Sequence, residues 1–369
     1  MALMEYLKEL VERNASDLHL VAGSPPMIRI NGELLPLEHD TNVLGRETVG
    51  TLFEPFFSDT QQAMLRNRQD VHTSLVSDIF SSTQYGDAQR FRVCAFWDRH
   101  GIGASLRVIP TKIPTLDQLF TPEAEVTFRK LANLRRGLVL VVGPVGSGKS
   151  TTVAAMIETI NTERCERIFT IEDPIEYAHS SKKSLISQRE VGSDVESYEQ
   201  GGISVMRADP DVVLVGELRT PEAVRIALAL AETGHLVFST IHAESASEAV
   251  RRMIEAFPDA RDTMQSLVAR SLQAVIGQRL VPRAARIGRA PANEIMLMNS
   301  RIRRMIGEGQ TDLTVAIEAG RDEGMRTMDD SLLSLYRDGT ISYEAAWLRI
   351  EDRERLGPRP LVAEEPATA

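Results

Sequence analysis

Cysteine is scarce in this chain of 369 residues, which holds only Cys94 and Cys165. The two cysteines lie far apart and form no C-x-x-C pair. They therefore exclude both a disulfide framework and a four-cysteine zinc site, and they fit a protein of a reducing compartment such as the cytoplasm.

Long apolar runs and an excess of basic residues are also missing. No apolar run approaches the roughly 18 residues that span a bilayer, so we expect any membrane contact to come through a partner. The N-terminus lacks the basic start and apolar block of a secretory signal. Lys and Arg total 42 against 52 Asp and Glu, a formal net charge of -10, which disfavours a protein whose main task is to bind nucleic acid.

The first part of the chain, residues 1–109, predicts a small α/β domain. Met4–Val11 has helical spacing, and the Asn31-Gly32 pair between two strand patterns is a strong hairpin signal. The segment PTKIPT then interrupts any regular element, which predicts a linker at residues 110–118.

Residues 119–356 predict a second, larger α/β domain. Short apolar, β-branched runs alternate with helical patterns, which is typical of a mostly parallel sheet covered by helices on both faces. The four expected strands are residues 138–142, 167–171, 212–215 and 235–240. Beyond residue 260 the pattern predicts almost only helices, and residues 357–369 predict a disordered tail.

A glycine-rich turn follows the first of these strands and leads into a helical pattern. The segment GPVGSGKST at 143–151 fills every position of the G-x-x-x-x-G-K-[ST] pattern. Its three glycines let successive backbone N–H groups point at one anion, and the next helix adds its positive dipole end. We expect Lys149 to reach the β- and γ-phosphates of ATP and Ser150 to offer its hydroxyl to Mg²⁺. The other loop residues expected at the nucleotide are Gly143, Pro144, Gly146, Ser147, Gly148 and Thr151.

Two carboxylates and two histidines lie where the later strands end, the edge at which parallel α/β sheets bind ligands. Glu172 starts an acidic turn with Asp173 and Glu176, and Glu217 follows the third strand. Like charges beside phosphates need a cation, so these carboxylates predict a site for Mg²⁺ and an attacking water, with a solvated acidic turn as the alternative.

The two histidines bracket the fourth strand. His242 leaves this strand at the expected active-site edge, where an imidazole could contact a γ-phosphate. His235 lies at the opposite end, where a purely structural role in anchoring the strand is the alternative.

Several segments spread along the chain carry a resemblance to a known family. They are ASDLHLVAGSPPMIRINGEL at 15–34, RFRVCAF at 90–96, RGLVLVVGPVGSGKSTT at 136–152, FTIEDPIEY at 169–177, SQREVG at 187–192, DPDVVLVGELR at 209–219 and AETGHLVFSTIHAESA at 231–246. Together they resemble the PilT family of secretion ATPases, the motors that retract type IV pili, over residues 3 to about 347.

The resemblance implies a PAS-like N-terminal domain and a RecA-like P-loop NTPase domain with a helical C-terminal region. It also implies a homo-hexameric ring that binds ATP between the two domains. Such a motor would act at the cytoplasmic face of the inner membrane, on a pilus platform protein or on secretion machinery.

The resemblance also implies roles for individual residues. Glu172 would activate water, Glu217 would lie on the Mg²⁺ side, and His235 and His242 would form the family's histidine box. Two arginines of the N-terminal domain, Arg92 and Arg107, would face the phosphates, where permanent cations suit the stabilisation of transition-state charge.

Two segments depart from the family's pattern. SRIRRMIGEG at 300–309 resembles the AIRNLIRE motif that retraction requires, but it begins with serine. Its helical spacing gives a basic stripe, Arg301, Arg303 and Arg304, that could transmit force to a partner, beside an apolar stripe, Ile302, Met305 and Ile306, that also fits a helix packed in a bundle. Gly201-Gly202 falls where the family has a helix, and each glycine costs a helix roughly 1 kcal/mol relative to alanine.

Other functions stay open beside the retraction motor. A type IVB or type II-like secretion ATPase would share the same core. The missing four-cysteine module favours the retraction branch over the type II relatives, whereas only the partner or the neighbouring genes would separate a type IVB ATPase. A nucleic-acid translocase is disfavoured by the acidic balance. A paralogue that does not hydrolyse ATP is disfavoured by the intact Lys149, Glu172 and Glu217.

Overall fold

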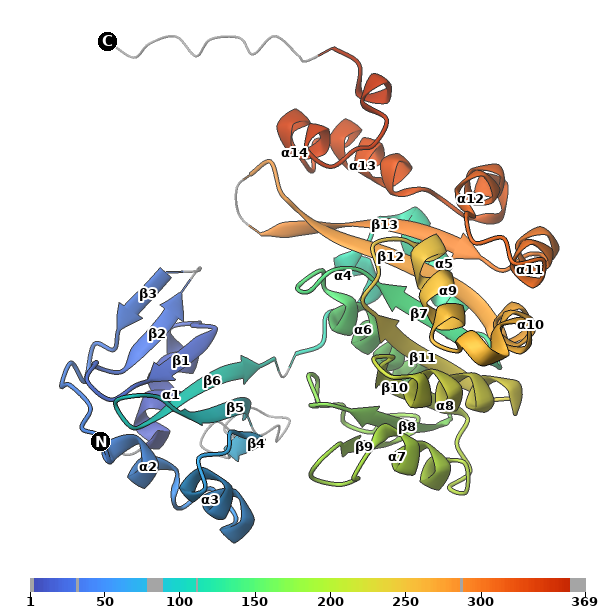
Figure 1. Cartoon of the computed structure of the whole chain (residues 1–369). Coiled ribbons are helices and arrows are strands. Elements are labelled where there is room, and N and C mark those ends of the chain that lie inside the picture. Colours follow the sequence, from blue (N-terminus) through green and yellow to red (C-terminus); the bar gives the residue numbers. More distant parts are fainter. Residues whose placement is uncertain (1–2, 31–32, 78–88, 111, 286–287, 359–369) are drawn as a thin grey trace, which may run out of the picture. The chain divides into compact units, whose positions relative to one another are not determined.

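The computed structural model describes residues 3–30, 33–77, 89–110, 112–285 and 288–358. It divides into two compact units, Met1–Lys112 with Glu176–Ala178 and Ile113–Ile175 with His179–Ala369 (Figure 1). The expected Asn31-Gly32 turn and all but the first two residues of the expected tail lie outside the described residues.

The N-terminal unit is an antiparallel sheet with helices on one face. The spatial order of its strands is β3-β2-β1-β6-β5-β4. The strands are β1 (Asp17–Leu20), β2 (Met27–Ile30), β3 (Glu33–Pro36), β4 (Val71–Ser77), β5 (Gln89–Trp97) and β6 (Ile102–Ile109). The helices are α1 (Leu3–Glu12), α2 (Thr48–Phe53) and α3 (Asp59–Arg66). Alternate residues of β5, such as Phe91 and Val93, are buried in one core with Leu7 of α1. The expected helix at 4–11 is confirmed by α1.

The larger unit is built on a sheet of order β13-β12-β7-β11-β10-β8-β9, in which every pair is parallel except β12–β13. Its strands are β7 (Gly137–Val142), β8 (Arg167–Glu172), β9 (Leu185–Glu190), β10 (Val212–Glu217), β11 (Leu236–Ile241), β12 (Leu272–Pro282) and β13 (Arg289–Leu297). Strands β7, β8, β10 and β11 confirm the four apolar runs predicted from the sequence.

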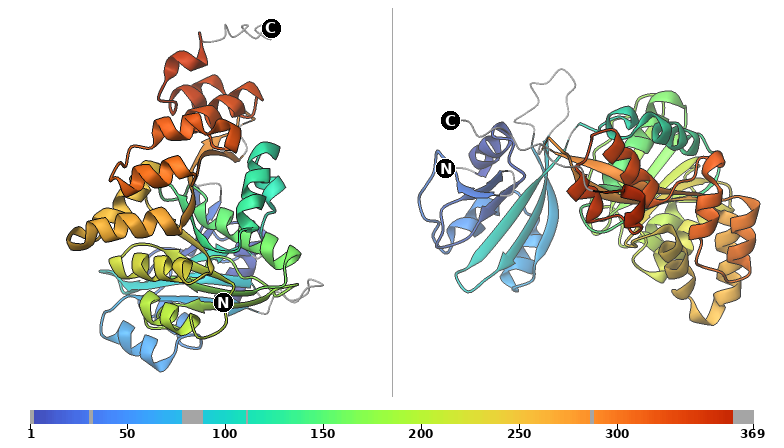
Figure 2. Two further views of the ribbon diagram at one scale, coloured as in Figure 1. Left: turned by 90° about the vertical axis from the view of Figure 1, so that its right-hand side faces the viewer. Right: turned by 90° about the horizontal axis from the view of Figure 1, so that it is seen from above.

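Helices cover both faces of this sheet, as Figures 1 and 2 show. The helices of the larger unit are α4 (Leu116–Leu119), α5 (Pro122–Ala132), α6 (Lys149–Glu163), α7 (Tyr198–Val205), α8 (Pro221–Glu232), α9 (Ala246–Glu255), α10 (Arg261–Ser271), α11 (Ser300–Gly307), α12 (Thr314–Ala319), α13 (Met328–Arg337) and α14 (Tyr343–Trp347). Leu138 and Leu140 of β7 face a core with α8, whereas Val139 and Val141 face a second core with α6. This double burial explains why β7 reads as a continuous apolar run. Helix α4 also begins inside the expected linker at 110–118.

The expectation of an almost purely helical chain beyond residue 260 is wrong. Helix α10 ends at Ser271 and β12 begins at the next residue, so no glycine or proline marks the change. Because both faces of β12 are covered, with Val275 in the core beside α8 and Ile276 in the core beside α6, the strand shows an apolar run in place of the alternation that signals a half-buried strand. Its partner β13 then carries α13, whose Leu332 packs on Ala292.

The two glycines of the departing segment lie inside a helix, α7, that the structure does form. A Cβ on Gly202 would lie 2.3 Å from Cγ2 of Ile226 in α8, and one on Gly201 would lie 3.1 Å from Cγ2 of Ile171 in β8. Ser197 caps the helix by accepting a hydrogen bond from the N–H of Gln200. The glycines therefore offset their helix cost by letting α7 approach its neighbours closely.

Helix α11 corresponds to the expected amphipathic segment. Ile302 and Ile306 are buried, as predicted, whereas Arg301 and Arg304 are exposed. Arg303 does not belong to the exposed basic stripe, because its Nη1 donates to the carbonyl of Ala269 at 2.5 Å in the last turn of α10. It caps α10, where the carbonyls lack helical partners. None of the helices in the described ranges has the length and apolarity to span a membrane.

Candidate nucleotide-binding and catalytic site

The glycine-rich loop joins the end of β7 to the start of α6, as the sequence predicts. Gly143 has φ +154° and Gly148 has φ +85°, values that other residues rarely adopt. A Cβ on Gly143 would lie 2.3 Å from the carbonyl oxygen of Gln278, and one on Gly148 would lie 2.9 Å from Nε2 of Gln278. Both positions therefore require glycine, for backbone angle and for space.

Lys149 is held at this loop by three contacts. Its Nζ donates to the carbonyl oxygens of Gly143 at 2.9 Å and Pro144 at 3.0 Å, and it lies 3.5 Å from Nδ1 of His242. The residue is 8% exposed. The ammonium group thus lies where the loop would receive a phosphate.

His242 connects this lysine to Glu217. Its Nε2 lies 2.8 Å from Oε1 of Glu217, whose Oε2 accepts a hydrogen bond from Nε of Arg219 at 2.6 Å. Because a protonated lysine can only donate, Nδ1 of His242 faces it as an acceptor. Oε1 of Glu217 is buried and accepts no well-aligned hydrogen bond, so its 2.8 Å contact with Nε2 is a close approach of imidazole and carboxylate. The three predicted residues Lys149, His242 and Glu217 therefore lie together at the carboxyl edge of the sheet.

Glu172, the last residue of β8, is 9% exposed at the same edge. Its Oε1 accepts a hydrogen bond from Nε2 of Gln188 at 3.2 Å. Its neighbours in the acidic turn, Asp173 and Glu176, are exposed. Within the described residues no group of three or more His, Cys, Asp or Glu side chains is arranged to hold a metal ion.

Tyr198 of α7 is a site residue that sequence reasoning missed. A Cβ on Gly216 would lie 3.2 Å from the Tyr198 hydroxyl, which places this hydroxyl beside the end of β10. Burial first, and then the negative charges of Asp173 and Glu217, raise the pKa of Tyr198 well above its usual value. It therefore stays a neutral hydroxyl, and no pattern in the sequence distinguished it from a core aromatic residue.

Gln278 of β12 is the second residue that sequence reasoning missed. Its Nε2 donates to the carbonyl of Ser147 at 2.7 Å, and its Oε1 accepts from Oγ1 of Thr152 at 2.8 Å. Nδ2 of Asn293 also donates to Oε1, and Arg326 donates to the other amide end of Asn293. Gln278 is 2% exposed, so one buried amide fixes the loop to both α6 and β12.

His235 lies away from this edge. It precedes β11, and its Nδ1 lies 2.9 Å from the carbonyl of Leu230 and 3.1 Å from Oγ1 of Thr233. In a parallel sheet the start of β11 and the end of β7 lie at opposite edges. The structure therefore does not bring His235 to the phosphate loop of its own chain.

Arg92 and Arg107 belong to the N-terminal unit. They are directly opposite each other on β5 and β6, and Asp17 of β1 is opposite Arg107 on its other side. Nε of Arg107 donates to Oδ1 of Asp17 at 2.8 Å, yet the arginine side chain stays 66% exposed. The two arginines thus form a pair of exposed cations on the sheet face that carries no helices.

The chain matches the model of the family "Type II/IV secretion system protein" over residues 1–321. It is 42% identical over 353 residues to the "Type IV pilus retractation ATPase PilT" of Pseudomonas aeruginosa, covering 94% of this chain and 97% of that protein. It is 40% identical over 338 residues to the "Twitching motility protein" of Neisseria gonorrhoeae, covering 91% and 87%. The crystal structure of the pilus retraction motor PilT with bound ADP matches with a TM-score of 0.85 at 36% identity, covering 96% of this chain and 98% of that one. The chain therefore belongs to the type II/IV secretion system protein family.

Proposed function

We propose that this chain is an ATPase that powers the retraction of type IV pili. The observation that carries the proposal is the 42% identity to a pilus retraction ATPase along 94% of the chain. The phosphate loop and the catalytic carboxylates supply the chemistry that such a motor needs.

The residues at the loop fit a nucleoside triphosphate. Besides the glycines and Lys149, the buried hydroxyl of Ser147 has no hydrogen-bond partner, so the loop offers an unused polar atom as well as a cation. Gly143–Thr151 would hold the phosphates, and Ser150, at the start of α6, would hold Mg²⁺ with Glu217 on its water side. The bound Mg²⁺ supplies positive charge that offsets charge developing on the phosphates.

The carboxylates divide the remaining work. Glu172 is buried at the carboxyl edge and is proposed to take the proton of the attacking water. His242 lies 2.8 Å from Glu217 and 3.5 Å from Lys149, so it is proposed to pass a change at the lysine on ATP binding to the carboxylate. Through His242, binding or loss of the nucleotide phosphates would change the position of Glu217 at the end of β10.

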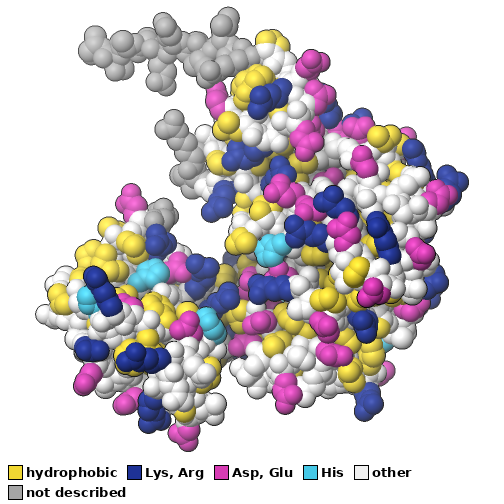
Figure 3. All heavy atoms as spheres, viewed as in Figure 1, with side chains coloured by type: hydrophobic (Ala, Val, Ile, Leu, Met, Phe, Trp, Pro, Cys, Tyr) yellow, Lys and Arg dark blue, Asp and Glu magenta, His cyan; other side chains and the backbone are white. Residues whose placement is uncertain are grey.

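Ring assembly completes the proposal. The exposed Arg92 and Arg107 are proposed to supply permanent cations to the nucleotide in the assembled homo-hexamer. The proposed location is the cytoplasmic face of the inner membrane, with the pilus platform protein as the partner that receives force. Figure 3 shows acidic side chains dispersed among the basic ones on the face in view, which suits a protein partner better than nucleic acid.

Steady-state ATP turnover of the purified chain tests the proposed chemistry. Wild-type chain should release phosphate and bind ADP, and Glu172→Gln should bind ADP while turnover falls roughly 100-fold or more, as expected for loss of a general base. Arg107→Ala should lower turnover while both units stay folded, with at most a small fall in melting temperature from the loss of the contact with Asp17. Wild-type protein without turnover at any protein concentration would contradict the ATPase proposal.

A further inference from the structure

We infer that Gln188 of β9 is a positioning residue for Glu172, and that it is itself held by the segment that follows the acidic turn. The inference rests on the proposed role of Glu172 as the base that takes the proton of the attacking water. It extends the site to a residue of β9 and to a contact with α6.

Gln188 and Glu172 are brought together by strand register. In the parallel pair β8–β9, Thr170 is opposite Gln188 and Glu172 is opposite Glu190, so Gln188 is the diagonal neighbour of Glu172 on the same face of the sheet. Its Nε2 donates to Oε1 of Glu172 at 3.2 Å. The amide therefore touches the carboxylate that is proposed to receive the proton.

The orientation of the Gln188 amide is fixed by its second contact. Its Oε1 accepts a hydrogen bond from the backbone N–H of His179 at 2.7 Å. A backbone N–H cannot accept and a carboxylate cannot donate, so only this orientation satisfies both neighbours. The NH₂ group must face Glu172.

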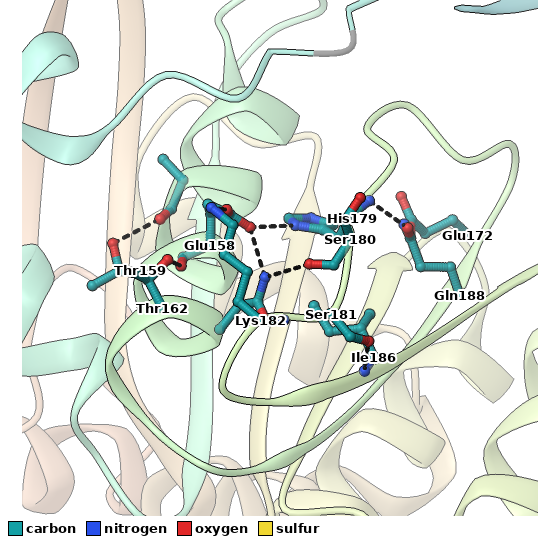
Figure 4. A network of polar contacts seen from close by, with 12 residues as sticks. Glu158, Thr159, Thr162, Glu172, His179, Ser180, Ser181, Lys182, Ile186 and Gln188 are labelled. Carbon is teal, nitrogen blue, oxygen red and sulfur yellow. Dashed lines mark hydrogen bonds and ion pairs between the residues drawn. The ribbon is translucent and has the colours of Figure 1, made fainter. Parts of the chain in front are cut away.

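His179 is in turn anchored to α6, the helix that begins at Lys149. Figure 4 shows the His179 side chain between Glu158 of α6 and the Gln188–Glu172 pair. This side chain is 2% exposed, and its Nδ1 lies 3.2 Å from Oε2 of Glu158. Lys182 forms an ion pair with the same carboxylate.

The backbone of the segment is fixed to α6 as well. Nδ2 of Asn161 donates to the carbonyl of Ser180 at 2.9 Å, and its Oδ1 accepts from the N–H of Lys182 at 2.9 Å. Asn161 is fully buried. The N–H of His179, which orients Gln188, therefore belongs to a loop that is fixed to α6. Hydrogen bonds thus connect Glu172, through Gln188 and this loop, to the helix that begins at the phosphate loop.

Gln188→Glu tests this inference selectively. The new carboxylate keeps nearly the same shape and can still accept from His179, but it removes the donor to Glu172 and sets a like charge beside it. We expect kcat for ATP to fall at least about tenfold, part of the roughly 10²–10⁴ that a general base contributes. The acid limb of the pH–turnover profile should move to higher pH, because facing carboxylates retain a proton more readily. KM for ATP and ADP affinity should stay as in wild type, whereas the melting temperature should fall modestly, because the like charges that make the carboxylates retain a proton also cost stability.

The matched control is Ser187→Ala on the same strand, whose hydroxyl contacts Arg167 and not Glu172. It should keep the turnover and pH profile of wild type. A Gln188→Glu variant with wild-type kcat and pH profile would overturn the inference, and so would a loss of turnover no larger than the unfolded fraction of the variant at the assay temperature. Full turnover by Glu172→Gln would instead contradict the proposed base itself, which separates the two failures.

Discussion

Nε2 of His242 lies 2.8 Å from Oε1 of Glu217, although the two residues are 25 positions apart in the chain and lie at the ends of different strands. Neighbouring parallel strands β10 and β11 bring them to one edge, where Nδ1 of the same imidazole lies 3.5 Å from Nζ of Lys149. The imidazole thus contacts the lysine on one side and the carboxylate on the other. We propose that this contact links phosphate binding to the carboxylate at the strand end.

Replacing His242 should uncouple binding from hydrolysis. In His242→Ala the phosphate loop is intact, so ADP affinity should stay within about twofold of wild type, whereas turnover should fall roughly 100-fold because Glu217 loses its orienting partner. Nucleotide affinity by calorimetry and phosphate release measure the two effects separately. His72→Ala, an exposed histidine of the N-terminal unit, is the control. An equal loss of affinity and turnover would show that His242 serves binding alone.

Gln278→Leu should weaken the phosphate loop and the fold together. The substitution leaves the carbonyl of Ser147 and the hydroxyl of Thr152 buried without their partner, at a cost of about 1–3 kcal/mol each. Chemical denaturation should show this loss, and ADP affinity should fall as well. The exposed Gln310→Leu serves as control. Wild-type stability in Gln278→Leu would mean that the loop does not depend on this amide.

The arginines of helix α11 allow its role in folding to be tested apart from its proposed role in transmitting force to a partner. Arg303→Ala should lower the melting temperature, because it removes the guanidinium that caps α10. The double variant Arg301→Glu with Arg304→Glu changes only exposed residues, so stability and ATP turnover should stay near wild type while pilus retraction is lost. Normal retraction in the double variant would remove the coupling role of α11.

Acid should destabilise the protein in part through Glu158. Burial alone would raise the pKa of Glu158, but hydrogen bonds from His179, Lys182 and Asn161 outweigh it and lower the pKa from 4.5 to about 2. A carboxylate with a depressed folded pKa adds stability above its unfolded pKa and loses it as the pH falls. The melting temperature of wild type should therefore drop between pH 4.5 and about 2 more than that of Glu158→Gln. Parallel curves for the two proteins would contradict this.

The sequence predicted the parts of the site that local chemistry determines. The phosphate loop follows from residue types at fixed spacing, and Glu172, Glu217 and His242 follow from their places at strand ends. What it missed depends on tertiary packing. Both faces of β12 are covered, so its apolar run does not show the alternation of a half-buried strand and fits a helix equally well. For the same reason the sequence does not identify Gln278 of β12 as a contact of the phosphate loop.

The remaining differences have the same physical origin. Gly201 and Gly202 lower the intrinsic helix propensity of α7, but they let α7 pack closely on Ile226 and Ile171. This stabilising packing is not visible in helix propensities. Arg303 belongs to a basic stripe by spacing alone, yet the carbonyl of Ala269 draws it into the interface between α10 and α11. In both cases the deciding partner is distant in sequence.

Pilus retraction in the source organism tests the central claim most directly. Labelled pili are followed by microscopy in cells whose only copy of this chain is wild type, is deleted, or carries Lys149→Ala. The account predicts that retraction occurs with wild type and is lost both in the deletion and in Lys149→Ala, although the variant protein is present at normal levels. Retraction at the wild-type rate in Lys149→Ala cells would contradict it.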